Sequence, residues 1–169
     1  MGPRTDRFDL GRLTLGSGEG RRLELEVVIL PLEFGGERYV VGRSAVVLDV
    51  TRTVGGYSLR LRSRTRLEGP CMRCLEHAGQ TVAFDAREVD QPGGGDELSS
   101  PYVSGDELDL EAWARDALAL ALPTQIVCRE DCLGLCPVCG EDLNAAGPEH
   151  GHEPATDPRW AKLGELRLE

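Results

Sequence analysis

The chain has 169 residues, a net charge of −10 and 40% hydrophobic residues, which predicts one core with at most a small appendage. The acidic balance excludes binding to nucleic acid or anionic membrane over the whole surface, and 5% aromatic residues argue against a large stacking surface for single-stranded nucleic acid. The mixed charges of "MGPRTDRFDL" and the lack of an uncharged stretch of about 18 residues indicate neither a secretory signal nor a membrane span. We therefore expect a cytoplasmic protein with reduced thiols.

The first half of the chain predicts a succession of antiparallel strands. Residues 21–32 alternate apolar and polar side chains, as a half-buried strand does. Residues 38–54 are rich in β-branched side chains and are interrupted by Gly42, which predicts a long strand bent at a bulge. Gly55 and Gly56 then predict a hairpin turn.

Residues 57–69 alternate so that apolar and hydroxyl side chains point one way and arginines the other. The arginines of this stripe are Arg60, Arg62, Arg64 and Arg66. Residues 80–89, "QTVAFDAREV", supply a further strand. The expected architecture is an antiparallel β-meander or partial barrel.

A helix is predicted over residues 109–122, after an irregular, exposed loop at 91–106. The apolar residues recur on one face of a 3.6-residue helix, Asp109 suits the N-cap and Pro123 stops the winding. We expect the apolar face to cover the open face of the sheet, which gives an α+β fold.

The C-terminal "DPRWAKLGELRLE" predicts a short helix that starts at Pro158 and docks through Trp160 and Leu163. We expect residues 1–127 to form the β-rich core, and residues 128–169 a Cys-rich zinc-knuckle segment with this docking helix. Both parts would belong to one integrated domain.

Six cysteines and two nearby histidines supply enough ligands for two tetrahedral zinc ions, each of which takes four N or S ligands. "CMRC" and "CPVCG" have the two-residue spacing that lets both thiolates reach one ion, and "CREDC" and "EHGHE" provide looser pairs. The preferred partition places Cys71, Cys74, Cys128 and Cys132 at one ion, and Cys136, Cys139, His150 and His152 at the other. The rival is a single zinc ribbon of Cys71, Cys74, Cys136 and Cys139. Either arrangement is structural, because no ligand position remains for a catalytic water.

Other interpretations of these residues stay open. "CMRC" also has the spacing of a redox dithiol, and Arg73 could lower the pKa of a thiol. Against this, the pair follows an antiparallel strand and does not open a helix in a βαβ unit. His150 and His152 could equally be solvated loop residues.

Four blocks carry a family resemblance: "CMRCL" after the β-rich half, then "DLEAWARDALALALP", "CREDCLGLCPVCGEDLN" and "DPRWAKL". Together they resemble the YceD family of bacterial proteins over roughly residues 67–166. The resemblance implies a non-enzymatic role in the synthesis, processing or stability of large-subunit ribosomal RNA, on the RNA or a pre-ribosomal particle. Related sequences carry a late cysteine pair where this chain has His150 and His152, which zinc also accepts.

Two charged segments suggest how such a protein could reach RNA. The stripe of Arg60, Arg62, Arg64 and Arg66 spaces its side chains about 6.6 to 7 Å apart, near the separation of successive phosphates, and is a candidate RNA contact. Alternatively, Glu24, Glu26 or Asp85 neutralise it across the sheet. Residues 85–116 hold ten acids and two arginines, which suggests an adaptor for a basic ribosomal protein. The sequence shows no phosphate loop, HExxH motif or nucleophile elbow, so no enzyme is expected.

Overall fold

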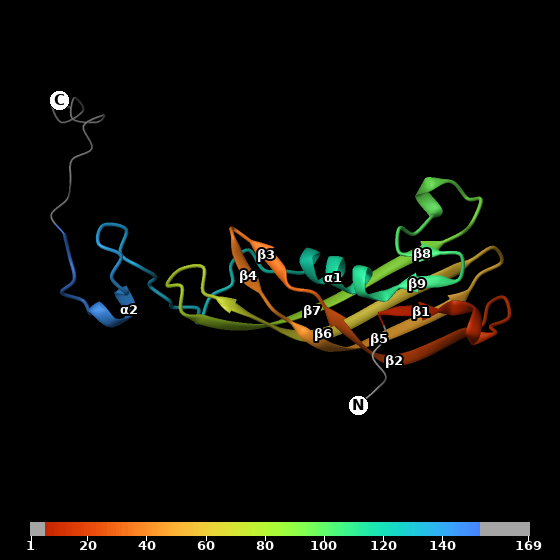
Figure 1. Cartoon of the computed structure of the whole chain (residues 1–169), viewed down its shortest axis with the longest axis horizontal. Coiled ribbons are helices and arrows are strands. Elements are labelled where there is room, and N and C mark those ends of the chain that lie inside the picture. The colour runs from red at the N-terminus through yellow and green to blue at the C-terminus, as the bar shows by residue number, and fades with distance from the viewer. Residues whose placement is uncertain (1–5, 153–169) are drawn as a thin grey trace, which may run out of the picture.

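The computed structural model describes residues 6–152, and these form an elongated molecule around one twisted antiparallel sheet (Figure 1). The strand order is β2-β5-β6-β7. The bounds are Gly20–Ile29 for β2, Gly42–Arg52 for β5, Tyr57–Pro70 for β6 and His77–Asp90 for β7. Strands β2 and β7 are the two edges, so the sheet stays open as a partial barrel. No helix in the described part of the chain is long and apolar enough to cross a membrane.

The inner face of the sheet carries the core, and the alternation predicted for β6 is observed. Leu59, Leu61 and Leu67 are buried, whereas Arg64 and Arg66 between them are exposed. This is the period of two that a strand with one solvated face requires. The predicted meander is therefore confirmed for the strands that form the sheet.

The expectation of one long strand bent at a bulge over residues 38–54 is right about the bulge but wrong about the continuity of the strand. Strand β4 (Glu37–Tyr39) pairs with β3 (Leu32–Phe34) in a separate hairpin, and only β5 belongs to the main sheet. Gly42 adopts a φ of 72°, which suits glycine. Beyond it Val40 pairs with Glu68 of β6, one residue out of register with the β5–β6 ladder, which is a β-bulge.

A small second sheet, in the order β1-β9-β8, was not predicted because its strands are too short to show a period. The bounds are Arg7–Asp9 for β1, Val103–Ser104 for β8 and Glu107–Asp109 for β9, with the 3-10 turns η1 at Leu10–Leu13 and η2 at Asp96–Leu98. The segment expected as an irregular loop at 91–106 thus contains η2 and β8. It is held to β7 because the Asp90 carboxylate accepts the N–H of Ser100 at 3.2 Å and Gln91 N–H donates to Leu98 O at 2.7 Å.

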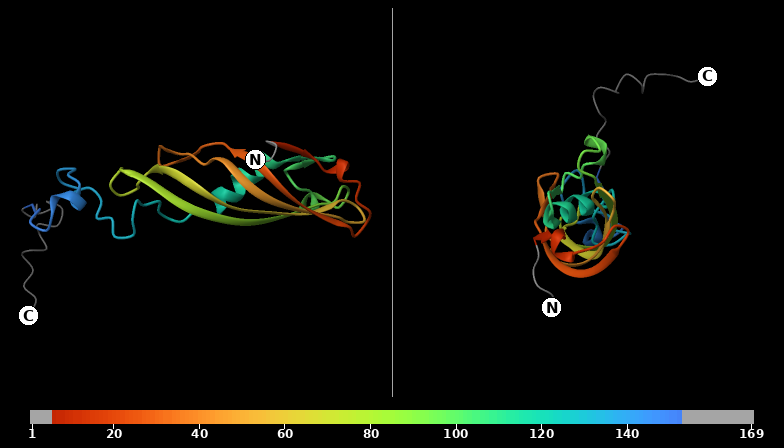
Figure 2. Two further views of the ribbon diagram at one scale, coloured as in Figure 1. Left: turned by 90° about the horizontal axis from the view of Figure 1, so that it is seen from below. Right: turned by 90° about the vertical axis from the view of Figure 1, so that its right-hand side faces the viewer.

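Helix α1 (Leu110–Leu120) lies inside the curve of the sheet, as the end-on view in Figure 2 shows. Asp109 caps it by accepting the N–H of Ala112 at 3.0 Å. Its buried face consists of Leu110, Trp113, Ala114, Ala117 and Leu118. A short helix, α2 (Leu143–Ala146), follows the last cysteines. The helix expected from Pro158 onward, with Trp160 and Leu163, lies outside the described residues.

Candidate metal centres

The "CMRC" segment is the turn that joins the two longest strands, β6 and β7. Cys71 N–H donates to Glu76 O at 2.7 Å, and Leu75 N–H donates to Cys71 O at 3.0 Å, which closes the turn. The segment that follows α1 runs back to this turn, where Met72 N–H donates to Ile126 O at 2.8 Å. These bonds deliver a second cysteine pair, Cys128 and Cys132, to the hairpin end of the sheet.

The first cluster consists of the sulfur atoms of Cys71, Cys74, Cys128 and Cys132, which lie within 4.8 Å of one another. The distance between Sγ atoms is 3.9 Å for Cys71 and Cys132, and 3.7 Å for Cys74 and Cys128. Four thiolates in a tetrahedron at about 2.3 Å from zinc would lie about 3.8 Å apart, whereas disulfide sulfurs lie about 2.05 Å apart. All four are free thiols, and their spacing fits a tetrahedral metal ion.

The second cluster consists of Cys136, Cys139, His150 and His152, whose ligand atoms also lie within 4.8 Å of one another. Its turn repeats the first: Gly140 N–H donates to Cys136 O, and Cys136 N–H donates to Glu141 O, both at 2.8 Å. Cys139 Sγ lies 3.6 Å from His150 Nε2, and His150 Nδ1 lies 3.3 Å from Glu141 Oε2. A carboxylate on the far ring nitrogen orients a histidine toward a metal.

Arg73, between the two cysteines of the first turn, fastens the incoming segment. Its Nε and Nη2 donate to Gln125 Oε1 at 3.2 and 2.9 Å, and its Nη1 donates to Cys132 O at 2.9 Å. The guanidinium therefore holds the backbone that carries two of the sulfur ligands.

Asn144, in α2, hydrogen-bonds a sulfur of the first cluster and was not singled out by sequence reasoning. Its Nδ2 donates to Cys132 Sγ at 3.6 Å, and its Oδ1 accepts the N–H of Leu133 at 2.9 Å. The N-cap of α2, Asp142, accepts from Asn144 Nδ2 at 2.6 Å. The available signal was its place in "GLCPVCGEDLN", the block that also carries the second cysteine turn.

In the first cluster the pKa of one thiol is lowered and the pKa of another is raised. Burial raises the pKa of Cys71, but backbone N–H groups, from Cys74 and Arg73 among others, outweigh burial and bring this pKa to about 6. The N–H of Glu76 lowers the pKa of Cys74, but burial and the neighbouring thiols outweigh it and raise this pKa to about 12. A divalent cation would offset the charge of several thiolates together.

In the second cluster the N–H of Cys139 and the side chain of His150 lower the pKa of Cys136 to about 6. Each cluster thus offers one cysteine that is mostly thiolate near neutral pH. Thiolate, and not thiol, is the metal-binding form of cysteine.

The structure groups the eight expected ligands as the two-ion partition does, and it brings "CMRC" to Cys128 and Cys132 instead of to "CPVC". The structure also shows how Arg73 acts on the thiols of "CMRC", which the redox interpretation depends on. The effect of Arg73 on Cys71 comes from its backbone N–H, 3.4 Å from the sulfur, while its guanidinium binds elsewhere.

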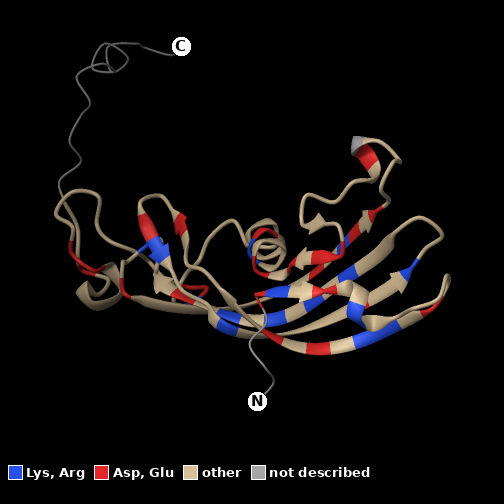
Figure 3. Cartoon of the chain, turned by 45° about the vertical axis from the view of Figure 1, so that its right-hand side comes forward, with Lys and Arg blue, Asp and Glu red and all other residues tan. Residues whose placement is uncertain are grey.

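The arginines of the stripe alternate with the buried leucines of β6, so they lie on the outer face of the sheet, where ion pairs compensate most of their charge. Figure 3 marks the Lys and Arg positions along the strands among those of Asp and Glu. Arg60 makes two bonds to Asp85, at 2.7 and 2.5 Å. Arg62 pairs with Asp49 at 2.5 Å. Of the acids proposed as partners, Asp85 therefore pairs with the stripe.

Arg66 bonds Glu68 at 3.0 Å, while Glu26 approaches Arg43 at 3.6 Å. Within residues 6–152, Arg64 makes no ion pair and is exposed. Arg64 is therefore the member of the stripe whose charge is available to a ligand.

Comparison with known proteins gives one family match. The family described as "Large ribosomal RNA subunit accumulation protein YceD" matches residues 59–167. This stretch includes most of β6, all of β7 and α1, and both clusters.

The chain is also 35% identical to "Uncharacterized protein Rv2926c" of Mycobacterium tuberculosis, over 94% of this chain and 79% of that protein. The same figures hold for "Uncharacterized protein Mb2951c" of Mycobacterium bovis. "Uncharacterized protein ML1660" of Mycobacterium leprae is 42% identical over 65 residues, which are 38% of this chain and 29% of that protein. No solved structure matches the chain.

Proposed function

The chain belongs to the YceD family, and on this premise we propose that it is a non-enzymatic factor that supports the synthesis, processing or stability of large-subunit ribosomal RNA. The observation that carries the proposal is the family match, which spans residues 59–167. The family description names the accumulation of an RNA and no catalysed reaction. The factor acts in the cytoplasm, on ribosomal RNA or a pre-ribosomal particle.

Two structural zinc ions complete the fold in this proposal. One is held by Cys71, Cys74, Cys128 and Cys132, and the other by Cys136, Cys139, His150 and His152; the sulfur spacing in the first cluster supports this. Zinc contributes charge compensation and four bonds in a tetrahedron. All eight donors belong to the protein, so the ions join the β6–β7 hairpin to the segment after α1 and leave no site for reaction chemistry.

Contact with RNA phosphates goes through the outer face of the sheet and centres on Arg64. The other stripe arginines, Arg60, Arg62 and Arg66, are already engaged by carboxylates, so they would have to exchange partners to bind phosphate. Arg64 needs no such exchange and can meet a phosphate directly.

Complementation tests the cellular role. In a bacterium from which its own family member is deleted, the ratio of large-subunit to small-subunit ribosomal RNA should fall, and this chain should restore it. Val54→Ala, at a side chain that is 96% exposed, should restore the ratio equally. An unchanged ratio after deletion would exclude the proposed role.

Binding to a transcript of large-subunit ribosomal RNA tests the contact. Arg64→Glu should weaken binding and lower the slope of log affinity against log salt by about 1. Arg12→Glu, on the exposed η1 turn, is the matched charge reversal away from the sheet face. Equal affinities and slopes for Arg64→Glu, for Arg62→Glu combined with Arg64→Glu, and for the unmodified chain would rule out this face as the RNA contact.

A second candidate function is an adaptor that binds a basic ribosomal protein. It is favoured by the acidic balance of residues 85–116, in which ten acids outnumber two arginines. Pull-down with purified ribosomal proteins should retain a basic one without RNA; retention of RNA alone would exclude the adaptor role.

A further inference from the structure

Strand β7 has a free edge beside helix α1. Cys71 N–H bonds Glu76 O across the hairpin turn, and the next pair, Pro70 and His77, cannot exchange two bonds because proline has no N–H. Alternate pairs of an antiparallel ladder are hydrogen-bonded. In β7 the backbone N–H and C=O groups of Ala78, and of every second residue after it, therefore bond to β6.

The alternate residues of β7 turn their backbone N–H and C=O groups away from β6. For Ala83, Asp85 and Arg87 these groups have no backbone partner within residues 6–152. Farther along, the edge is closed, because Gln91 N–H bonds Leu98 O. A segment of about seven residues therefore offers an open template for another strand.

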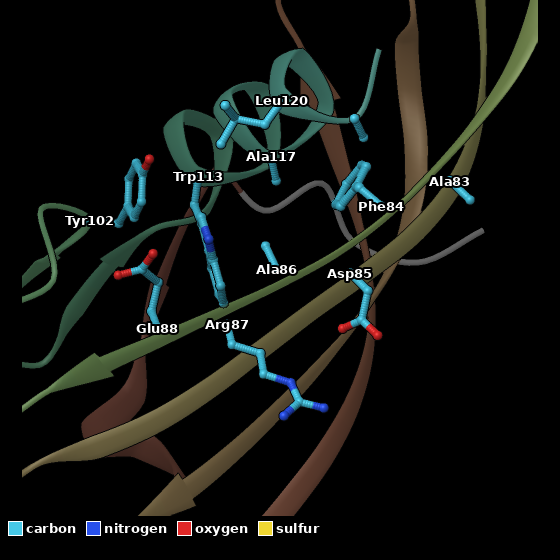
Figure 4. A pocket seen from close by; sticks show the side chains of 11 residues that line it. Ala83, Phe84, Asp85, Ala86, Arg87, Glu88, Tyr102, Trp113, Ala117 and Leu120 are labelled. Carbon is cyan, nitrogen blue, oxygen red and sulfur yellow. The ribbon is translucent and has the colours of Figure 1, made fainter. Parts of the chain in front are cut away.

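A groove of about 420 Å³ runs along this edge, between β7 and α1 (Figure 4). Phe84 and Trp113 approach it from opposite elements, with Ala86 and Ala117 between them. At its rim Leu120 is 90% exposed. The groove has room for an aromatic or aliphatic side chain next to the free edge.

The same side of the edge is acidic. Tyr102 OH donates to Asp116 Oδ2 at 3.1 Å, and besides burial, Asp116 and Glu88 both raise the pKa of this tyrosine, which places the two carboxylates close to its ring. Within the described residues Glu88 makes no ion pair. Asp116 has one cation near it, Arg115, at 3.6 Å.

We propose that the β7 edge and this groove bind an extended, basic segment of a partner protein, which adds a strand along Ala83, Asp85 and Arg87. Side chains of the added strand alternate between the faces of the sheet. On the groove side, an apolar side chain enters between Phe84 and Trp113, and a neighbouring Lys or Arg meets Glu88. Main-chain bonds provide affinity and the alternate side chains provide specificity.

The charge pattern selects this occupant over a second copy of the chain. Two β7 edges paired with each other would bring their Glu88 carboxylates to one face, and like charges on paired strands are unfavourable. The inference deepens the adaptor candidate and rests on it only for the basic character of the partner; it requires no RNA contact.

The probe is the peptide acetyl-Thr-Arg-Thr-Phe-Thr-Arg-Thr-amide, which presents Arg, Phe and Arg on one face in either strand direction. Adding it to the full chain should slow hydrogen exchange of the Ala83, Asp85 and Arg87 amides and shift the indole N–H resonance of Trp113. The peptide with Glu in place of Arg should bind to the unmodified chain at least tenfold more weakly. The original peptide should likewise bind to the Glu88→Gln variant at least tenfold more weakly.

Two substitutions at one position separate backbone from side chain. Arg87→Pro removes an outward N–H but no bond to β6, and proline is tolerated on edge strands; it should weaken binding at least tenfold. Arg87→Ala keeps the N–H and should bind as well as the unmodified chain, or better. Hydrogen exchange in β6 without peptide checks that both variants fold.

Failure of the peptide to protect these amides, or equal binding by both variants, would overturn the proposal. Protection that depends on protein concentration instead of peptide would point to a second copy and would overturn it as well. The rescue of ribosomal RNA ratios by the chain is a separate readout, so either inference can fail while the other stands.

Discussion

Leu75 and Gly140 occupy equivalent positions in the two cysteine turns, and both adopt the left-handed backbone conformation, with φ angles of 64° and 77°. Each follows the second cysteine of its pair and donates its N–H to the carbonyl of the first, at 3.0 and 2.8 Å. Glycine adopts this conformation without steric cost, whereas leucine brings Cβ close to a carbonyl oxygen. The first turn therefore carries backbone strain that the second does not.

Gly140→Ala should lower the free energy of unfolding by about 1 kcal/mol. A Cβ at this position meets no atom within 4 Å, so the cost is conformational. Leu75→Gly should shift stability the opposite way, because the lost side chain is 60% exposed and buries little. Urea unfolding at saturating zinc measures both, and a Gly140→Ala protein as stable as the unmodified chain would disprove the equivalence.

The two-ion partition predicts a specific pattern of metal loss. The unmodified chain should bind two zinc ions, and His150→Ala combined with His152→Ala should bind one. Cys128→Ser combined with Cys132→Ser should also retain one, in the other cluster. Elemental analysis of protein purified without a metal-binding tag gives the counts. A single zinc that survives both double substitutions would instead support the ribbon of the two CxxC pairs.

Asn144→Ala should weaken zinc binding at the first cluster by about 10- to 100-fold, as loss of a group that hydrogen-bonds a ligand does. The substitution removes the bond to Cys132 Sγ and the bond to Leu133 N–H. Competition with a chromogenic chelator measures the affinity. Leu133→Ala is the control, since its side chain is 65% exposed; an equal effect of both variants would contradict a specific role for Asn144.

Asp49 should contribute stability that is lost in acid. The hydrogen bond from Arg22 lowers its pKa below the ordinary value, against the opposing effect of burial, and Arg62 adds to the lowering. A carboxylate with a depressed pKa in the folded state stabilises above its unfolded pKa, and the contribution disappears as pH falls through the folded value.

Asp49→Asn should therefore cost about 1 kcal/mol near neutral pH, and the difference from the unmodified chain should shrink below about pH 4. Urea unfolding between pH 7 and 3 measures it. Glu33→Gln, on the β3–β4 hairpin, serves as the control. A difference that stays constant across this range would show that Asp49 does not act through its charge.

Sequence periodicity was sufficient to predict the long strands and the long helix. The alternation in β6 and the helical face from Leu110 to Leu118 repeat many times, and each repeat independently reports which side is buried. Short elements were missed for the same reason: β1, β8 and β9 have two or three residues, and the separation of β4 from β5 depends on one glycine. Their positions follow from backbone pairing with distant residues, which local patterns do not record.

The sequence by itself determined which residues could bind metal, because cysteine spacing within a turn is a local property, and it determined that one face of β6 is charged. Only the tertiary structure decided the partners: it brought Cys128 and Cys132 to the hairpin turn, matched Asp85 and Asp49 to the arginines, and left the β7 edge open beside α1. Contacts between segments far apart in the chain depend on how all the elements pack together, so side-chain chemistry and local spacing leave several arrangements possible until the fold selects one.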